Sequence, residues 1–180
     1  KDLGVARFTS LFDARGNLVD QTFLGLDGKL ALSKDKGAAR EVWSFDEKGT
    51  VLTRSFFGID GKPVLNRDHG VAGYRFKYND NGRKIGEAYI GVDGKPILRK
   101  DIGVARIAST FNERGNLVED AFFDFDDKPA LHKTWGAARR TWTYDDRGNL
   151  IEGADFGLRG ERVLGRSDGT AKSTTRYDER

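Results

Sequence analysis

The sequence of 180 residues has no cysteine and no methionine, and it has only three prolines and two histidines. Without cysteine, disulfides, thiolate catalysis and cysteine-ligated metals are excluded. The histidines, His69 and His132, fall at different places of a 33-residue sequence repeat, so we expect them to be surface loop residues and not a catalytic or metal site. No apolar run is long enough for a membrane span or a secretory h-region. Because methionine is lacking even at residue 1, we expect a piece of a longer protein.

A large excess of one charge is also lacking. The 31 lysines and arginines are nearly balanced by 28 aspartates and glutamates, which gives a net charge of +3. This balance provides no strong field toward nucleic acid or a membrane surface. Charged residues make up 33% of the chain, but 12 Phe, 5 Tyr and 3 Trp supply apolar surface to bury. We therefore expect a folded chain with a core.

Glycines recur at a fixed interval of 33 residues, and each opens a G-[VAT]-A motif. This period predicts one continuous array: repeats at 4–36, 37–69, 70–102, 103–135 and 136–168, the end of an earlier repeat at 1–3, and the start of a sixth at 169–180. Ankyrin repeats have the same period, but the glycines interrupt any helical apolar stripe. A single unit of this size cannot bury enough surface to fold alone, so neighbouring units must stack. The recurring glycines are Gly4, Gly37, Gly70, Gly103, Gly136 and Gly169.

Two turn signals occur in each repeat. The first runs from Asp13 to Asn17, where an Asp or Asn opens the turn and a Gly follows three residues later. This pattern predicts a type I turn with a G1 bulge. The second is Asp27-Gly28, a two-residue hairpin signal. Repeats four and five depart from it with Asp126-Asp127 and Arg159-Gly160, so we expect altered turns there.

The segments between the turns predict three strands per repeat, at residues 6–12, 18–25 and 30–34 of the first copy. The fold class is therefore all-β, with tandem 33-residue β-hairpin repeats that form an elongated solenoid or a spiralling antiparallel sheet. A meander of three strands would reverse direction at every copy. Either the third strand is a short connector, or neighbouring units are related by a large rotation.

Residues 45–49, FDEKG, and residues 144–150, YDDRGNL, resemble the YD repeats of bacterial Rhs-type proteins. Those repeats carry a Tyr-Asp pair, a turn, a Gly and then an apolar residue. The DGKP and YDxxGN elements are also similar to the WG-type and MORN-like families. The resemblance covers every copy, although the strict spacing and the DGKP turn depart from the YD pattern. It implies a segment of a large bacterial protein, and for the Rhs type a wall segment of a toxin-encapsulating β-shell.

Two basic rows recur in the repeats. One contains Arg40, Arg106 and Arg139, together with Arg7 and Lys172, while Gly73 interrupts it. The other consists of Lys34, Arg67, Lys100, Lys133 and Arg166. Stacked repeats would turn each row into a ladder that could bind an anionic partner. The alternative is pairing with acidic rows, at Asp35, Asp68 and Asp101 and at Asp13, Asp46 and Asp145, because unpaired like charges would repel. The sequence favours the alternative.

Aromatic residues that do not recur are the other candidate binding residues. Trp43, Tyr74, Trp135 and Trp142 could anchor a protein or sugar partner. They could equally belong to the core. No calcium motif accompanies the many Asp-Gly pairs, since neither a Gly-Gly-x-Gly-x-Asp repeat nor an EF-hand loop fits.

The sequence thus predicts a non-catalytic repeat array without cofactor or metal. The expected function is protein binding or scaffolding within a larger bacterial protein, with another protein or other domains of the same chain as partner. Alternatives are the wall of an Rhs-like shell and recognition of cell-surface carbohydrate. We expect no nucleic acid partner and no membrane insertion, while cytoplasm and cell surface or secretion are both open. Flanking domains could be enzymatic.

Overall fold

The computed structural model describes residues 4–165, 169 and 172–175, and the chain divides into two compact units, residues 1–100 and 101–180. In the first unit the strands are β1 (Arg7–Phe12), β2 (Leu18–Leu24), β3 (Arg40–Phe45), β4 (Val51–Phe57), β5 (Gly73–Tyr78) and β6 (Lys84–Ile90). In the second they are β7 (Arg106–Phe111), β8 (Leu117–Phe123), β9 (Arg139–Tyr144), β10 (Leu150–Phe156) and β11 (Lys172–Thr174). The described residues contain no helix.

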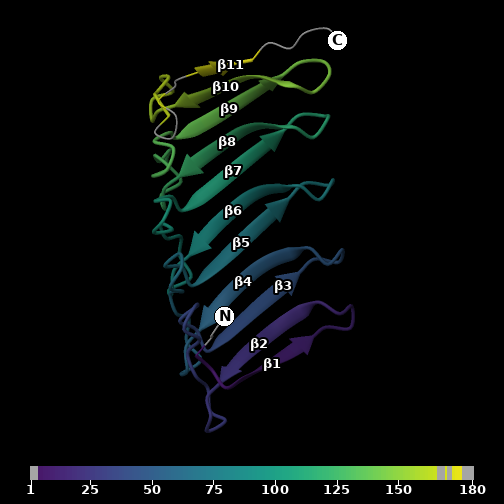
Figure 1. Cartoon of the computed structure of the whole chain (residues 1–180), viewed down its shortest axis with the longest axis vertical. Coiled ribbons are helices and arrows are strands. Elements are labelled where there is room, and N and C mark those ends of the chain that lie inside the picture. The colour runs from purple at the N-terminus through teal and green to yellow at the C-terminus, as the bar shows by residue number, and fades with distance from the viewer. Residues whose placement is uncertain (1–3, 166–168, 170–171, 176–180) are drawn as a thin grey trace. The chain divides into compact units, whose positions relative to one another are not determined.

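Within each unit, consecutive strands pair antiparallel. Hairpin tips and longer connectors therefore lie at opposite ends of the strands (Figure 1). The predicted all-β class, with tandem hairpins in an antiparallel sheet, is confirmed. The predicted repeat boundaries stay a prediction. Residues 1–3 lie outside the described residues, as does most of 169–180.

The hairpin tips have the predicted type I turn with a G1 bulge. In the first tip, Asp13 N–H donates to the Asn17 carbonyl at 3.0 Å, and Gly16 N–H donates to the Asp13 carbonyl at 3.0 Å. Gly16 has a φ of 82°, a left-handed conformation that glycine adopts without strain. The Asp13 carboxylate accepts the N–H groups of Arg15 and Asn17, each at 2.9 Å. An acid at the first position and a glycine at the fourth therefore fix this turn.

The second turn keeps one geometry in all five repeats, which corrects the expectation of altered turns. Asp127 stands where the other repeats have glycine, and its φ of 63° is equally left-handed. Aspartate tolerates this region better than most residues because its short side chain bonds locally. Asp127 N–H donates to the Asp124 carbonyl at 3.2 Å, and Gly160 N–H donates to the Gly157 carbonyl at the same distance.

The predicted third strand is absent from every described repeat. Only one residue after each second turn forms a bridge, as Leu30 does with Leu24 and Pro63 does with Phe57. Beyond this bridge the chain leaves the sheet and becomes a connector to the next hairpin. The third segment is thus a short connector, the first of the two alternatives. With two strands per repeat, all first strands within a unit run in the same direction.

The core of each unit is a narrow band in which connectors cover one face of the sheet. One aromatic residue on the second strand of a hairpin is nearly inaccessible in four repeats: Phe23, Phe56, Tyr89 and Phe122. The connector bonds to the backbone at this residue, for example from Val64 N–H to the Phe56 carbonyl at 3.0 Å. Small residues of the G-[VAT]-A motif, such as Ala38, Ala39 and Ala72, are buried beside the strands.

Candidate functional site

Successive connectors bond to each other through their backbones. In the first unit, Arg67 N–H donates to the Lys36 carbonyl at 2.8 Å, and Lys100 N–H donates to the His69 carbonyl at 2.9 Å. In the second, Lys133 N–H donates to the Ile102 carbonyl at 2.8 Å. These bonds join each repeat to the previous one in addition to the strand pairing.

The basic row of the connectors contributes to the same contact. The Arg67 guanidinium donates to the Lys34 carbonyl at 2.8 Å, and the Lys100 ammonium donates to the Arg67 carbonyl. The Arg67 stem also lies over Gly37, where an added Cβ would be 2.9 Å from Arg67 Cγ. The left-handed backbone at residue 37 (φ 69°) and the neighbouring Arg67 side chain therefore both require glycine there. The Arg166 member of this row lies outside the described residues.

The basic row of the first strands, which contains Arg40, Arg106 and Arg139, forms ion pairs, mostly between neighbouring hairpins. Arg40 bonds Asp20 at 2.5 Å, Arg139 bonds Glu119 at 3.1 Å and Lys172 bonds Glu152 at 2.9 Å. In each case the acid lies on the strand that precedes the cation's strand. The hydrogen-bonded carboxylate of Asp20 raises the pKa of Arg40, and the bond from Lys172 lowers the pKa of Glu152.

Acid and cation are both missing at one place in this row, while before Arg106 the acid alone is replaced, by Gly86. Where the third repeat has Gly73, the place that corresponds to Asp20 holds Thr53. Arg106 instead bonds Asp127 of its own repeat at 2.6 Å. Charge pairing was predicted for this row, but the partners are different acids, because the turn aspartates bond their own backbone.

Each of the three arginines also covers a phenylalanine of its own hairpin. The guanidinium carbon is 5.8 Å from the ring centre of Phe57 for Arg40, 3.7 Å from that of Phe123 for Arg106 and 4.0 Å from that of Phe156 for Arg139. Cation–π contacts of this kind stabilise modestly at partly exposed sites. Arg40, Arg106 and Arg139 are therefore engaged within the sheet.

The covered face carries a different polar group in each repeat. In the second repeat, Glu41 is only 2% exposed, and Arg54 Nε donates to its Oε2 at 3.0 Å. The Arg54 guanidinium lies 5.6 Å from the Trp43 ring centre and 4.9 Å from that of Phe56. Trp43 is half-buried, and Arg54 covers it from the neighbouring strand.

The third repeat places Tyr74 in the core, at 7% exposure. Its ring is edge-on to Phe56 and Tyr89, with ring centres 5.9 Å apart in both pairs. Asn66 Nδ2 donates to the Tyr74 hydroxyl at 3.2 Å, and His69 Nδ1 bonds the same hydroxyl. Burial raises the pKa of Tyr74. Tyr74 was predicted to be either an anchor for a partner or a core residue, and the structure places it in the core.

The histidines are not the surface loop residues that the sequence suggested, because the connectors fold over the sheet. His69 Nε2 lies 2.9 Å from Arg99 Nη2, and since a guanidinium has only donors, this nitrogen accepts. His132 is buried, with its ring centre 3.9 Å from that of Trp135 and 5.0 Å from that of Phe122.

The buried hydroxyl of Tyr89 makes no hydrogen bond of normal geometry with the described residues, although Arg99 and Glu87 lie close enough to affect its pKa. Tyr89 is a tyrosine where the first, second and fourth repeats have phenylalanine. Burial is the main cause that raises the pKa of Tyr89.

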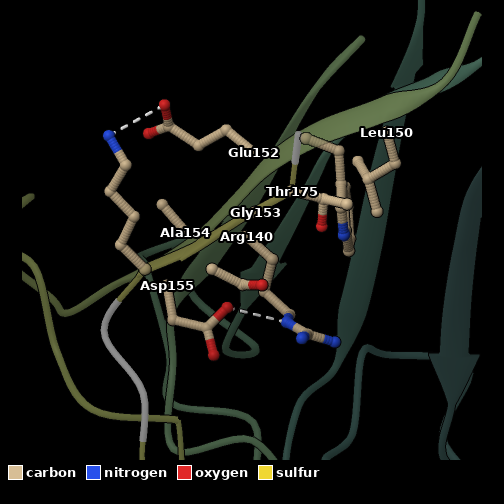
Figure 2. Close-up of a pocket in the computed structure, with 10 residues that line it drawn as sticks. Arg140, Leu150, Glu152, Gly153, Ala154, Asp155 and Thr175 are labelled. Atoms are coloured by element: carbon tan, nitrogen blue, oxygen red, sulfur yellow. Dashed lines mark hydrogen bonds and ion pairs between the residues drawn. The ribbon is translucent and has the colours of Figure 1, made fainter. Parts of the chain in front are cut away.

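The fifth repeat has a hollow of about 190 Å³. Asp155 replaces the core aromatic residue, and Gly153 stands where the other repeats have Gln21, Arg54, Glu87 and Asp120. Arg140 Nε donates to Asp155 Oδ1 at 2.8 Å, and the two side chains point toward each other in Figure 2. The Arg140 guanidinium also lies 4.6 Å from the Trp135 ring centre and 5.3 Å from that of Trp142.

The predicted aromatic set is thus not one cluster. Trp43 belongs to the first unit, whereas Trp135 and Trp142 share Arg140 in the second. All three are half-buried. Gly153 and Asp155 were missed as site residues. Alignment of the five copies would have found them, because both break a column of larger side chains.

Within the described ranges, no group of three or more histidine, aspartate or glutamate side chains could hold a metal ion. A helix of the length and apolar character needed to cross a membrane is likewise not found in the described part of the chain.

The fold and these contacts define a tandem β-hairpin repeat protein. No protein-family model and no curated protein matches the sequence. Among solved structures, a complex of TcdB2-TccC3 with Cdc42 is similar, with a TM-score of 0.35 and 18% identity over 82% of this chain. A Tc holotoxin pore of Photorhabdus luminescens with a mutant TccC3 has a TM-score of 0.34 and 16% identity over 82% of this chain. The chain spans 7% of the length of each of these chains, and such low values carry no argument about its activity or partners.

Proposed function

We propose that this chain is a non-catalytic scaffolding segment of a larger bacterial protein. In this role it is a stretch of β-sheet wall that holds other parts of the same chain or another protein. The proposal includes the wall of an Rhs-like shell as its most specific form. That form rests on the resemblance of the turn motifs to YD repeats.

The observation that carries this proposal is the recurrence of contacts between successive repeats. Backbone bonds join the connectors, as between Arg67 and Lys36. Ion pairs join the hairpins, as between Arg40 and Asp20. Polar side chains of the covered face, such as Glu41 and Arg54, also bond to each other within the sheet. A chain whose recurrent groups bond to the next repeat is suited to bear load and to keep a fixed spacing.

The rigidity that a scaffold needs can be tested within the first unit. The chain has no cysteine, so the exposed tip residues Ala14 and Asp80 can be changed to cysteine and labelled for single-molecule energy transfer. We expect one narrow distance distribution, unchanged by denaturant below the unfolding transition. A broad distribution, or two exchanging populations in the native chain, would contradict a scaffold.

Recognition through individual aromatic anchors is the competing role. A variant with Trp43, Trp135 and Trp142 changed to alanine tests it, while Tyr74 is left in place because its removal would damage the core. In pull-downs with the wild-type chain and this variant, a scaffold retains the same proteins with both forms. Loss of a protein with the variant alone, with an unchanged circular dichroism spectrum, would favour recognition.

A further inference from the structure

The hollow of the fifth repeat lies where β10 carries two substitutions, Gly153 and Asp155, on the same face of the strand. Gly153 pairs directly with Trp142 across β9 and β10. The matched place in the second repeat pairs Arg54 with Trp43, and Arg54 covers that ring. Trp142 has no side chain opposite it at residue 153, and an added Cβ there would lie at ordinary contact distances, 3.7 Å from its Cδ1 and 3.9 Å from its Nε1. The charged group near this indole is Arg140 of its own strand, whose guanidinium carbon is 5.3 Å from the ring centre.

The polar groups of the hollow are charged but mutually neutralised. On the face of Trp142, Arg140 bonds Asp155, whose side chain is 10% exposed. The second pair at the hollow, Lys172 with Glu152, lies on the opposite face of the sheet. An anionic ligand would have to separate Arg140 from its carboxylate, and a cationic ligand would have to separate Asp155 from its guanidinium. A purely apolar ligand would remove these groups from water without replacing their hydrogen bonds, which is costly. The arrangement therefore suits a neutral ligand that is rich in hydroxyl groups.

Unused hydrogen-bonding capacity remains beside the indole. The Arg140–Asp155 bond uses Nε and Oδ1, while a guanidinium has five donors and a carboxylate has two accepting oxygens. The hydroxyl side chains of Ser173 and Thr175 also line the hollow. The indole supplies an apolar wall and one N–H donor. Together these groups offer donors, acceptors and an aromatic surface within one small space.

We propose that this hollow binds a single neutral pyranose ring of a saccharide. Trp142 would contact the apolar side of the ring, and Arg140 with Asp155 would bond its hydroxyl groups. The volume of about 190 Å³ agrees with one ring, since drug-sized ligands occupy pockets of roughly 300–1,000 Å³. The second repeat offers no such space, because Arg54 fills it.

The test is a titration of the ¹⁵N-labelled full chain, observed at the indole N–H signals of its three tryptophans. The probes are the methyl glycosides of glucose, galactose, mannose and N-acetylglucosamine, each raised to about 50 mM so that a site with a Kd in the millimolar range, about −4 kcal/mol, is saturated. We expect saturable shifts of the Trp142 signal with at least one glycoside. The Trp43 signal is the matched internal control and should not move.

Gly153→Gln is the decisive variant, because glutamine occupies the same place in the first repeat. It should fill the hollow and abolish the Trp142 shift, while the Trp43 and Trp135 signals show that the fold is kept. Asp155→Asn should weaken binding at least tenfold. No shift with any probe, equal shifts of Trp43, or a shift that survives Gly153→Gln would each overturn the proposal. These outcomes do not affect the scaffolding proposal, which rests on other contacts.

The source of the ring is decided by a second titration with a linear oligosaccharide of the sugar that binds. Tighter binding of the oligosaccharide indicates a polysaccharide chain as the ligand, with neighbouring rings on flanking residues. Equal affinity indicates a free monosaccharide.

Discussion

The ion pair between Glu41 and Arg54 should be the most sensitive charged contact of the first unit. The Glu41 side chain is 3% exposed and that of Arg54 is 31% exposed. Arg54→Gln would leave a buried carboxylate without its cation and remove two cation–π contacts. We expect this variant to lower the free energy of unfolding by about 3 kcal/mol, as for other buried charges that lose one partner.

The double variant should recover most of this loss. Glu41→Ile introduces the residue found at that place in the fourth repeat, Ile107. Alone it should cost about 1 kcal/mol, because the partly exposed Arg54 can turn to solvent. With both changes the buried carboxylate is gone, and the total cost should also be about 1 kcal/mol, since an apolar replacement of a buried pair is often neutral. The expected coupling between the two sites is therefore about 3 kcal/mol.

Urea unfolding followed by far-ultraviolet circular dichroism measures all three variants against the wild-type chain. Arg40→Gln is the matched control, because its pair with Asp20 is more exposed, with side-chain exposures of 48% and 17%. We expect this control to cost about 0–1 kcal/mol. If Arg54→Gln costs no more than the control, or if the two changes are additive, the burial argument is wrong.

Three further perturbations test the turns and the core. Gly82→Val should lower the free energy of unfolding by about 1–3 kcal/mol. Gly82 has a φ of 74° and no atom within 4 Å of an added Cβ, so backbone strain is the whole effect. A melting temperature equal to that of the wild type would refute the turn assignment. Tyr89→Phe should be neutral or stabilise by up to about 1 kcal/mol, since the buried hydroxyl makes no hydrogen bond of normal geometry. A clear loss in urea unfolding would show that it bonds Arg99 or Glu87, the charged groups near it. Bonds from Asn17 lower the pKa of Asp13, the backbone of Thr50 lowers that of Asp46, and Asn149 lowers that of Asp145. The folded values lie below the unfolded value of about 3.9, so this stabilisation is complete above about pH 5 and is lost as the pH falls through the folded values; a melting temperature that does not fall in this acidic range would contradict the assignment.

The turns were predictable from sequence because their chemistry is local. An Asp three residues before a Gly, as in Asp13 and Gly16, satisfies its own backbone bonds wherever it occurs. The third strand was not predictable, because a single bridge at Leu30 and a full strand have the same alternation of residues. What ends the pairing is the path of the connector across the sheet, which depends on contacts with the neighbouring repeat.

The candidate site was predictable only in part for the same reason. The tryptophans were visible as residues that do not recur. Which side chain lies beside each ring depends on the fold: Arg54, the cross-strand partner, for Trp43, and Arg140 of the same strand for Trp142, whose cross-strand partner is Gly153. The acid partners of the arginine row were missed because they lie on the preceding strand, about 20 residues earlier in the chain.

Because acid and cation are both missing at one place in this row, deletions of whole repeats would have different consequences for charge pairing. Unequal recombination removes or duplicates whole 33-residue units without disturbing the backbone geometry. Removal of residues 37–69 would bring the strand of Asp20 against the strand of Gly73, and the acid would lose its cation. Removal of residues 37–102 would instead bring it against Arg106 and keep the charges matched. The charge pattern therefore distinguishes deletions of whole repeats by about 0–1 kcal/mol for each lost pair, although every one of them preserves the period.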